Sequence, residues 1–357
     1  MKSHSSAIRF MVILKRKGNN MRKSINVAVI GAGYWGRKVV SEYLQLAKEN
    51  PGVNLAKVCD LRDENLKFCE EALHVKGDLL SSEYSNVLCS QDIDAVHICT
   101  PNDTHHKFCL EALEAGKHVL LEKPMALSAK DAWELVSVAD YKHLCLQVGL
   151  IFRFNNALKM IRDLIAQNYF GSLYYLKLQW TTLMPSPLGR DIIFDLGPHP
   201  VDIMNFSLKK WPLKVGCSAR AYRRKSLEEV AYIAMEFDDN IMAHVELSWL
   251  QPGKVREFSI MGEKRSAIVD CLNQTIRVYE SNNSGNFGLD VTRNNTIFDE
   301  VSHFVNSILE NNNCRNPGPI GAGNVVVLES LKKSIDEERT VKAGSGAKWR
   351  ELQSFPC

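Results

Sequence analysis

The sequence has no hydrophobic run long enough to cross a membrane. Residues 10–14 are apolar and follow basic residues, but this stretch is too short for a signal peptide and no small-residue cleavage pattern follows it. The ten cysteines are scattered singly, without any C-x-x-C pair. We therefore expect a cytoplasmic protein with reduced cysteines, no disulfide framework, no metal site and no membrane association.

The main part of the chain also lacks an excess of basic charge. The net charge is +3, but residues 1–24 hold seven Lys or Arg and no acid, which leaves 37 basic against 41 acidic residues in 25–357. This balance argues against a nucleic-acid partner. We expect residues 1–24 to be a disordered N-terminal extension or, because Met21 stands just before the first expected strand, the result of a mistaken start.

What the sequence does contain is the hydrophobic pattern of two domains. Its 357 residues are 45% hydrophobic, which is enough for two cores. From Ile25 on, short apolar runs alternate with amphipathic helical segments, and this predicts a doubly wound α/β domain with a parallel sheet over residues 25–149. We expect its strands at 26–30, 55–59, 95–99, 118–121 and 144–148, and a capped helix at 128–139.

The pattern changes after about Gly149. Strand-like runs joined by short turns lie at 174–182, 215–223, 230–237, 241–249, 255–261, 266–271 and 275–280. Helical segments are expected around 157–166, after Pro200, near 299–310 and at 321–336, and residues 282–295 are expected to form a loop. The second domain, residues 150–345, is thus predicted to be α+β with a large, mostly antiparallel open sheet, followed by a C-terminal tail at 346–357.

A glycine-rich turn follows the first expected strand. The segment from Gly31 to Gly36 reads G-A-G-Y-W-G, which is the G-x-G-x-x-G pattern, and it opens an amphipathic helix. Here Gly31 would allow a tight turn, Gly33 would let the backbone approach a pyrophosphate, and Gly36 would permit close packing of helix and strand. The anion would then lie at the positive helix N-terminus. These features predict a Rossmann site for a dinucleotide, with Tyr34 and Trp35 among its binding residues.

An acid ends the second expected strand. Asp60 lies 24 residues beyond Gly36, where a carboxylate can accept hydrogen bonds from both ribose hydroxyls and would repel a 2′-phosphate. This favours NAD over NADP. Arg62 could offset part of that repulsion, so use of NADP stays open. The alternative is a tight turn in another kind of doubly wound domain with an acid there by chance.

Polar residues also follow the strand expected at 95–99. Thr100, Pro101, Asn102 and His105 come directly after it. In such folds ligands bind at the carboxyl edge of the sheet, so we expect these residues to contact the cofactor.

The sequence Glu122-Lys123-Pro124 follows the next strand. Pro124 biases the residue before it away from helical backbone angles, so the ammonium of Lys123 leaves the strand end at a fixed place. The alternative is an ordinary solvated surface charge.

Asp195 and His199 stand four residues apart at the entry to a helix. If that turn is helical they share one face, although Pro198 and Pro200 make a regular turn doubtful. The alternative is that Asp195 caps the helix and His199 packs in the core.

Together these motifs resemble the glucose–fructose oxidoreductase and inositol dehydrogenase family. The resemblance runs from about Ile25 to Gly344 and consists of G-A-G-Y-W-G, C-D, T-P-N-x-x-H, E-K-P, G-x-x-x-R-F and D-x-G-x-H-x-x-D in the family's order. It implies that Lys123, Asp195 and His199 form the reaction site beside a bound NAD. It also implies that the T-P-N-x-x-H segment and the E-K-P acid Glu122 shape the nicotinamide pocket.

The residue types suit the oxidation of a secondary alcohol. Near pH 7 a neutral His199 can take the hydroxyl proton while hydride leaves the same carbon for the nicotinamide. Lys123 would stabilise the developing alkoxide, and Asp195 would orient the substrate or the imidazole. Arg153, in the G-x-x-x-R-F stretch, would meet an anionic or hydroxyl-rich substrate, although an arginine after a strand is as often structural.

Several functions stay open at this point. The chain is similar to the branch that oxidises the 3-hydroxyl of nucleotide-linked N-acetyl sugars, and a free-sugar or inositol dehydrogenase is the alternative. A sensor that binds NAD or a sugar without turnover is disfavoured by the presence of Lys123 and His199, and His199 also argues against a one-way reductase. We expect the loop at 183–190 to select the substrate, and the resemblance implies a homodimer or homotetramer that pairs through the open sheet.

Overall fold

The computed structural model describes residues 24–185, 190–223, 225, 227–282 and 285–353; the expected N-terminal extension lies outside these residues except for Ser24. The first half contains β1 (Ile25–Ile30), α1 (Tyr34–Glu49), β2 (Val53–Cys59), α2 (Asp63–Leu73), β3 (Leu80–Ser81), α3 (Tyr84–Cys89), β4 (Ala95–Ile98), α4 (His105–Glu114), β5 (His118–Leu121), α5 (Ala129–Lys142) and β6 (Leu146–Val148). The second half contains α6 (Asn156–Ala166), β7 (Leu173–Thr182), α7 (Ile192–Leu196), α8 (Pro198–Leu208), β8 (Lys214–Arg220), β9 (Val230–Glu236), β10 (Met242–Ser248), β11 (Lys254–Gly262), β12 (Arg265–Asp270), β13 (Thr275–Glu280), β14 (Asn286–Leu289), α9 (Thr296–Leu309), α10 (Gly318–Glu337), β15 (Val341–Lys342) and α11 (Ala347–Gln353).

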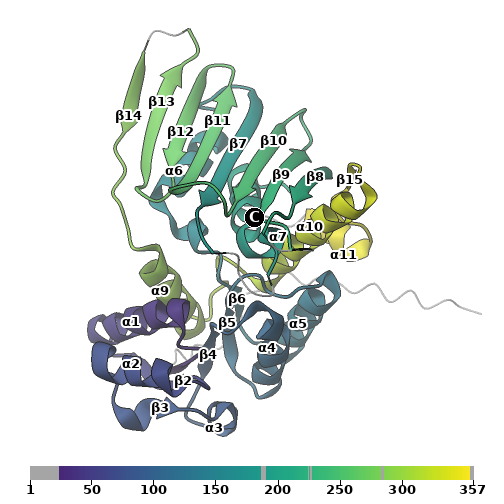
Figure 1. The fold of residues 1–357 in the computed structure, drawn as a ribbon. Coiled ribbons are helices and arrows are strands. Elements are labelled where there is room, and N and C mark those ends of the chain that lie inside the picture. Colours follow the sequence, from purple (N-terminus) through teal and green to yellow (C-terminus); the bar gives the residue numbers. More distant parts are fainter. Residues whose placement is uncertain (1–23, 186–189, 224, 226, 283–284, 354–357) are drawn as a thin grey trace, which may run out of the picture.

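Two sheets organise the molecule, one in each half of Figure 1. The first has six parallel strands in the order β3-β2-β1-β4-β5-β6. The second has nine strands in the order β14-β13-β12-β11-β7-β10-β9-β8-β15. The predicted fold class, a doubly wound parallel sheet followed by an α+β part with a large open sheet, is confirmed.

The parallel sheet is buried on both faces, which explains why its strands are short apolar runs. All four residues of β4 are buried, as are five of the six in β1. Helix α1 covers one face, where Val39 and Tyr43 pack, and α4 and α5 cover the other. Because β1, β4 and β5 are neighbours and run in the same direction, the segments that follow them emerge side by side at one edge.

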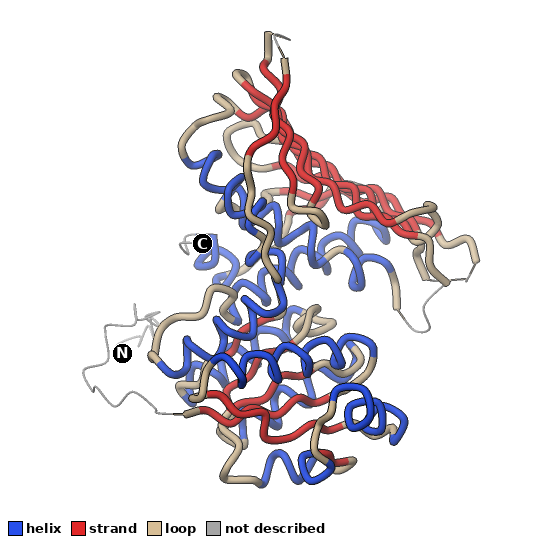
Figure 2. The backbone as a smooth tube through the Cα atoms, turned by 90° about the vertical axis from the view of Figure 1, so that its left-hand side faces the viewer, coloured by secondary structure: helices blue, strands red, loops and turns tan. Residues whose placement is uncertain are grey.

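The second sheet pairs its described strands antiparallel except for β7 and β10, which are parallel. Along β10 the buried residues Ala243, Val245 and Leu247 alternate with Met242 and other residues of the opposite face. Helices cover one face, and the other carries none of the described helices (Figure 2). The prediction of a loop over 282–295 was partly wrong, since β14 forms there and pairs with β13.

Helices α9 and α10 pack against the first half of the chain, although the predicted domain boundaries assigned both to the second domain. Asn295 caps α9 by accepting hydrogen bonds from two backbone amides, and Val301, Phe304 and Val305 of this helix share a buried cluster with Tyr43 of α1. Helix α10 packs against α5 as well as β8. Packing therefore joins part of the segment predicted as the second domain to the first one.

The expected C-terminal tail is partly helical. In α11 the side chain of Trp349 is 5% exposed, and its ring lies 5.7 Å from that of Trp211. This apolar contact fixes the end of the described chain against the second half. Among the described residues no helix combines the length and apolar character that a membrane span needs.

Candidate active site

The glycine turn between β1 and α1 has the geometry of a pyrophosphate site. Gly31 has φ of +90°, and a Cβ there would lie 2.7 Å from the carbonyl oxygen of Cys99. A Cβ on Gly36 would lie 1.8 Å from the Gly31 oxygen, so both positions require glycine. A Cβ on Gly33 would meet nothing within 4 Å, and no side chain caps the helix that begins behind it. The first amides of α1 are thus open to an anion.

Asp60 borders the same cleft as the glycine turn. Its carboxylate accepts hydrogen bonds from the backbone amides of Ala32 at 2.6 Å and Arg62 at 2.9 Å. These bonds fix the carboxylate beside the turn, where an adenosine ribose would lie. Arg62 faces Glu64 at 3.8 Å on the exposed surface. Because an exposed pair of this length contributes little free energy, Arg62 remains able to meet a 2′-phosphate.

Replacing Asp60 with alanine is expected to weaken NAD binding by about 10- to 100-fold, because hydrogen bonds to a charged acceptor are worth about 1.5–3 kcal/mol. NADP should bind relatively better once the repulsion is gone. Isothermal calorimetry with both cofactors measures this. Glu64→Ala, which removes an exposed acid nearby, is the control. Unchanged NAD affinity in Asp60→Ala with no gain for NADP would remove Asp60 from the ribose site.

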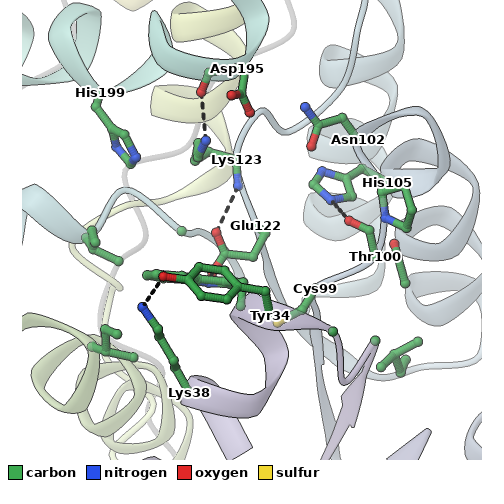
Figure 3. Close-up of a pocket in the computed structure, with 18 of the residues that line it drawn as sticks. Tyr34, Lys38, Cys99, Thr100, Asn102, His105, Glu122, Lys123, Asp195 and His199 are labelled. Carbon is green, nitrogen blue, oxygen red and sulfur yellow. Dashed lines mark hydrogen bonds between the residues drawn. The ribbon is translucent and has the colours of Figure 1, made fainter. Parts of the chain in front are cut away.

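The segment after β4 lies against the E-K-P segment (Figure 3). The buried ring of His105 lies between the carbonyl oxygens of Thr100, at 2.8 Å, and Pro124, at 2.7 Å. Burial lowers the pKa of His105 despite these two acceptors, so the neutral ring donates to one of them. His105 therefore ties the two segments together. The Nδ2 atom of Asn102 is buried without a hydrogen-bond partner among the described residues, which leaves it available to a ligand.

Glu122 organises the floor of the cleft and is only 7% exposed. One oxygen accepts a hydrogen bond from the indole nitrogen of Trp35, and the other faces the backbone amide of Lys123 at 3.3 Å. The carboxylate thus connects Trp35 of the glycine turn to the backbone of Lys123.

His97 of β4 is fully buried. Its Nε2 atom lies 3.4 Å from Glu122, and its Nδ1 atom has no partner among the described residues. Cys99 completes a group of ligand-type atoms within 4.8 Å of one another. The spacing in the sequence did not indicate this cluster. Both oxygens of Glu122 already serve Trp35 and Lys123, so the structure gives this group no clear role as a metal site.

The three residues expected at the reaction site line one cleft with the glycine turn. The Nζ atom of Lys123 donates a hydrogen bond to the backbone oxygen of Asp195 at 2.8 Å (Figure 3). The Asp195 carboxylate instead faces Arg190 at 3.2 Å. The ring of His199 lies 5.0 Å from that of Phe152 and 6.0 Å from that of Trp180.

The geometry changes the role expected of Asp195. A continuous helix would have placed Asp195 and His199 on one face, but α7 ends at Leu196 and α8 begins at Pro198, with Gly197 between them. The Nδ1 atom of His199 is buried without a partner among the described residues, and the carboxylate of Asp195 pairs with Arg190. Asp195 therefore does not orient the imidazole in this structure, and it positions Lys123 through its backbone oxygen.

The surroundings of His199 keep its imidazole neutral. Burial is the main cause of a pKa well below the ordinary value, and the positive charges of Lys123, Arg256 and Lys254 lower it further. A neutral imidazole is the form that can accept a proton.

This shift predicts how the rate of substrate oxidation depends on pH. The value of kcat/KM should stay on its plateau as the pH falls through about 6.5, the ordinary histidine pKa, and decline only below it. Initial rates between about pH 5 and 8 measure this. A midpoint at or above the ordinary histidine pKa would contradict a depressed pKa for the base.

The prediction that Arg153 contacts the substrate is wrong. Its side chain is buried, with Nε 2.7 Å from the Asp202 carboxylate and Nη2 2.6 Å from the amide oxygen of Asn205, and it does not line the cleft. The buried pair connects the short helical turn at Ile151–Phe154 to α8. Arg153 thus supports the helix that carries His199.

Arg153→Met is therefore expected to reduce the free energy of unfolding by about 3–5 kcal/mol, because it leaves the Asp202 carboxylate buried without its partner. Urea unfolding followed by circular dichroism gives this value. The double variant Arg153→Met/Asp202→Leu should recover part of the loss. A single variant as stable as the wild type would show that the pair does not support α8.

The sequence reasoning missed two cations on the substrate side of the cleft, Lys254 and Arg256 of β11. They occupy alternate positions on the face of β11 that carries the buried residues Phe258 and Ile260. Arg256 is a cation at a core-facing position of a strand, which was the available signal, whereas Lys254 at the start of the strand is exposed. The expected substrate-selecting loop contributes Arg190 to the cleft, and its residues 186–189 lie outside the described part of the chain.

These features define a class of protein. Gly31 and Gly36 close the turn, and Gly33 leaves room for a phosphate. The amide nitrogen of Asn102 has no partner among the described residues, so the site fits an NAD molecule whose nicotinamide end reaches Lys123 and His199. A Rossmann domain that carries a lysine at its cleft, faced by a neutral histidine from a second, sheet-rich domain, is the arrangement of an NAD-dependent dehydrogenase.

Comparison with known protein families agrees. Residues 25–150 match the oxidoreductase family with an NAD-binding Rossmann fold, and residues 158–268 match the C-terminal domain of the same family, GFO/IDH/MocA. The chain belongs to this family, and it is an NAD-binding oxidoreductase of the dehydrogenase class.

Three comparisons with individual proteins give the degree of similarity. A UDP-N-acetylglucosamine 3-dehydrogenase of Acidithiobacillus ferrooxidans is 27% identical over 80% of this chain and 88% of its own. A solved structure of that enzyme superposes with a TM-score of 0.77, at 25% identity, and covers 88% of this chain and 98% of its own. A dTDP-3,4-didehydro-2,6-dideoxy-alpha-D-glucose 3-reductase of Saccharopolyspora spinosa is 24% identical over 70% of this chain and 76% of its own.

Proposed function

We propose that this protein oxidises the 3-hydroxyl of a nucleotide-linked N-acetyl sugar to a keto sugar, with NAD as the hydride acceptor. The observation that carries this proposal is the size of the cleft, about 2180 Å³. Ligand pockets usually measure about 300–1,000 Å³. The cleft has room for NAD and a second ligand of nucleotide size. The likeness to the 3-dehydrogenase of A. ferrooxidans supports the same substrate class.

The side chains of the cleft divide the reaction between them. NAD, when bound, accepts the hydride from the carbon that carries the hydroxyl. The imidazole of His199, held neutral by its surroundings, takes the hydroxyl proton. The ammonium of Lys123, fixed by the Asp195 backbone oxygen, stabilises the negative charge that develops on the substrate oxygen. The aromatic rings of Phe152 and Trp180 exclude water around the histidine.

Matched substrates test the substrate assignment. UDP-N-acetylglucosamine, free N-acetylglucosamine, glucose and myo-inositol are each incubated with NAD at neutral pH, and reduced nicotinamide is followed by absorbance. An amine acceptor with its aminotransferase removes the keto product, whose formation is uphill. The nucleotide sugar should have the highest kcat/KM. A higher value for glucose or inositol would make the enzyme a free-sugar or inositol dehydrogenase and leave the hydride transfer in place.

We further propose that the protein acts as a homodimer or homotetramer in the cytoplasm, paired through the uncovered face of the second sheet. That face presents Tyr175, Tyr232 and Met242, which are 42%, 59% and 55% exposed. Apolar side chains grouped on an uncovered sheet face favour association. Light scattering of the purified protein tests this, and a monomer that retains full activity would contradict it.

A further inference from the structure

Within the described part of the chain, Arg256 is a buried cation without a carboxylate partner. Its side chain is 8% exposed, and no salt bridge joins it to any acid among the described residues. The Nη1 atom donates hydrogen bonds to the backbone oxygens of Thr181, at 2.8 Å, and Val255, at 2.7 Å. The guanidinium packs 4.9 Å from the ring centroid of Trp180. These contacts fix the group and leave Nε and Nη2 without a partner in the described structure.

A buried, unpaired charge is costly unless something compensates it. Burial lowers the pKa of Arg256 to about 10, so the group is still a cation at neutral pH. Asp195, an acid of the cleft whose charge acts on Arg256, has Arg190 as its ion-pair partner. The compensating charge is therefore absent from the described part of the protein, and an anionic ligand can supply it.

Lys254 reinforces the positive charge at this place. It lies two residues before Arg256 on the same face of β11 and also lines the cleft. It has no salt bridge among the described residues, and partial burial, followed by the charge of Arg256, lowers its pKa. Two neighbouring cations with open donors form a site for a group of more than one negative charge.

The position of Arg256 separates it from the cofactor's pyrophosphate, which belongs at the Gly31 turn on the other sheet, whereas Lys254 also lies near Tyr34 and Lys38 of α1. Arg256 packs on Trp180, and the ring of Trp180 lies 6.0 Å from that of His199. An anion at Arg256 would thus lie close to the histidine that takes the substrate proton. In a nucleotide sugar the phosphate is attached to the anomeric carbon, which only one ring carbon separates from the 3-position.

We propose that Arg256, assisted by Lys254, binds the phosphate groups attached to the anomeric carbon of the substrate and so selects nucleotide-linked over free sugars. The identity of the sugar in this inference rests on the proposed function. The binding of an anion rests on the two cations that have no acidic partner among the described residues. The guanidinium offers its two free nitrogens to phosphate oxygens. Lys254 adds a second positive charge at the mouth of the site.

The test compares substrates with and without phosphate. In Arg256→Met, kcat/KM for UDP-N-acetylglucosamine should fall roughly 10- to 100-fold, as the loss of charge-assisted hydrogen bonds implies. The value for free N-acetylglucosamine and the affinity for NAD should change less than about twofold, since neither uses the site. Arg162→Met is the matched control, because Arg162 also packs on an aromatic ring, at 4.8 Å from that of Phe206, but lies outside the cleft. N-acetylglucosamine 1-phosphate shows whether the sugar-linked phosphate alone is sufficient.

Two results would overturn the proposal: an equal fall for the nucleotide sugar and the free sugar, or a loss of NAD affinity. Lys254→Met, an exposed position that cannot disturb the core, serves if Arg256→Met does not fold, and it should show the same selectivity to a smaller degree. Calorimetry of UDP with the NAD-bound enzyme separates this proposal from the proposed function. If free sugars prove the better substrates but UDP binds and Arg256→Met abolishes its binding, the substrate assignment fails and the anion site stands. If UDP binds equally to both proteins, the anion site fails.

Discussion

Replacing His199 with alanine is expected to lower kcat for sugar oxidation by about 10²- to 10⁴-fold, the usual contribution of a general base. The reason lies in the surroundings of the ring, where burial and three nearby cations keep the imidazole neutral and able to accept a proton. The variant should remain folded and bind NAD normally, because no described residue hydrogen-bonds to Nδ1 of this ring. Steady-state kinetics with the best substrate of the panel gives the value.

His106→Ala is the matched control for this variant. His106 lies on the surface of α4 and pairs with Glu134 at 2.9 Å, so its loss should leave kcat unchanged. Added imidazole should partly restore the activity of His199→Ala, since the truncated side chain leaves space for it. His199 would not be the base if kcat of His199→Ala fell by less than tenfold. The same would follow if imidazole did not restore its activity and its pH profile matched that of the wild type.

Lys123→Met is expected to reduce kcat by about 10²- to 10³-fold, which is the typical effect of removing one donor that stabilises a developing oxyanion. Its ammonium is held by the backbone oxygen of Asp195 at 2.8 Å and so has a fixed position in the cleft. Methionine keeps the length of the side chain and removes the charge. Kinetics at saturating NAD separate the loss in kcat from any change in cofactor affinity.

Lys107→Met, at an exposed position of α4, is the control for the loss of a lysine. Lys123→Met should have an unfolding temperature close to that of the wild type, because among the described residues the ammonium makes one hydrogen bond. Turnover within tenfold of the wild type would mean that the substrate oxygen does not lie against this ammonium.

The parallel sheet could be predicted from the sequence because its strands are apolar runs with clear boundaries. The strand expected at 118–121 agrees in its bounds with β5, and that at 275–280 with β13. The capping pattern likewise placed the start of α5, where the hydroxyl of Ser128 accepts from the amide of Asp131. In each case the signal is local, since a buried strand or a helix cap needs only nearby residues.

The rest depended on partners that a sequence does not name. The apolar stripe of α9 indicates that the helix is buried, but not that it packs on α1, some 250 residues earlier. Arg153 stands in a motif and yet faces Asp202, because the two lie on adjacent elements of the folded chain. The roles of Glu122 and Arg256 similarly follow from contacts between distant strands and turns. Periodicity predicts which face of a helix or strand is buried, but it does not predict which other element packs against that face.

The most direct test of the account follows the hydride itself. UDP-N-acetylglucosamine that carries deuterium on ring carbon 3 is incubated with the protein, NAD and the coupled aminotransferase, and the reduced cofactor is analysed by mass spectrometry. The account predicts deuterium in the reduced nicotinamide, formed by the wild type and nearly absent with His199→Ala. Reduced cofactor without deuterium, or product formed without reduced cofactor, would contradict it.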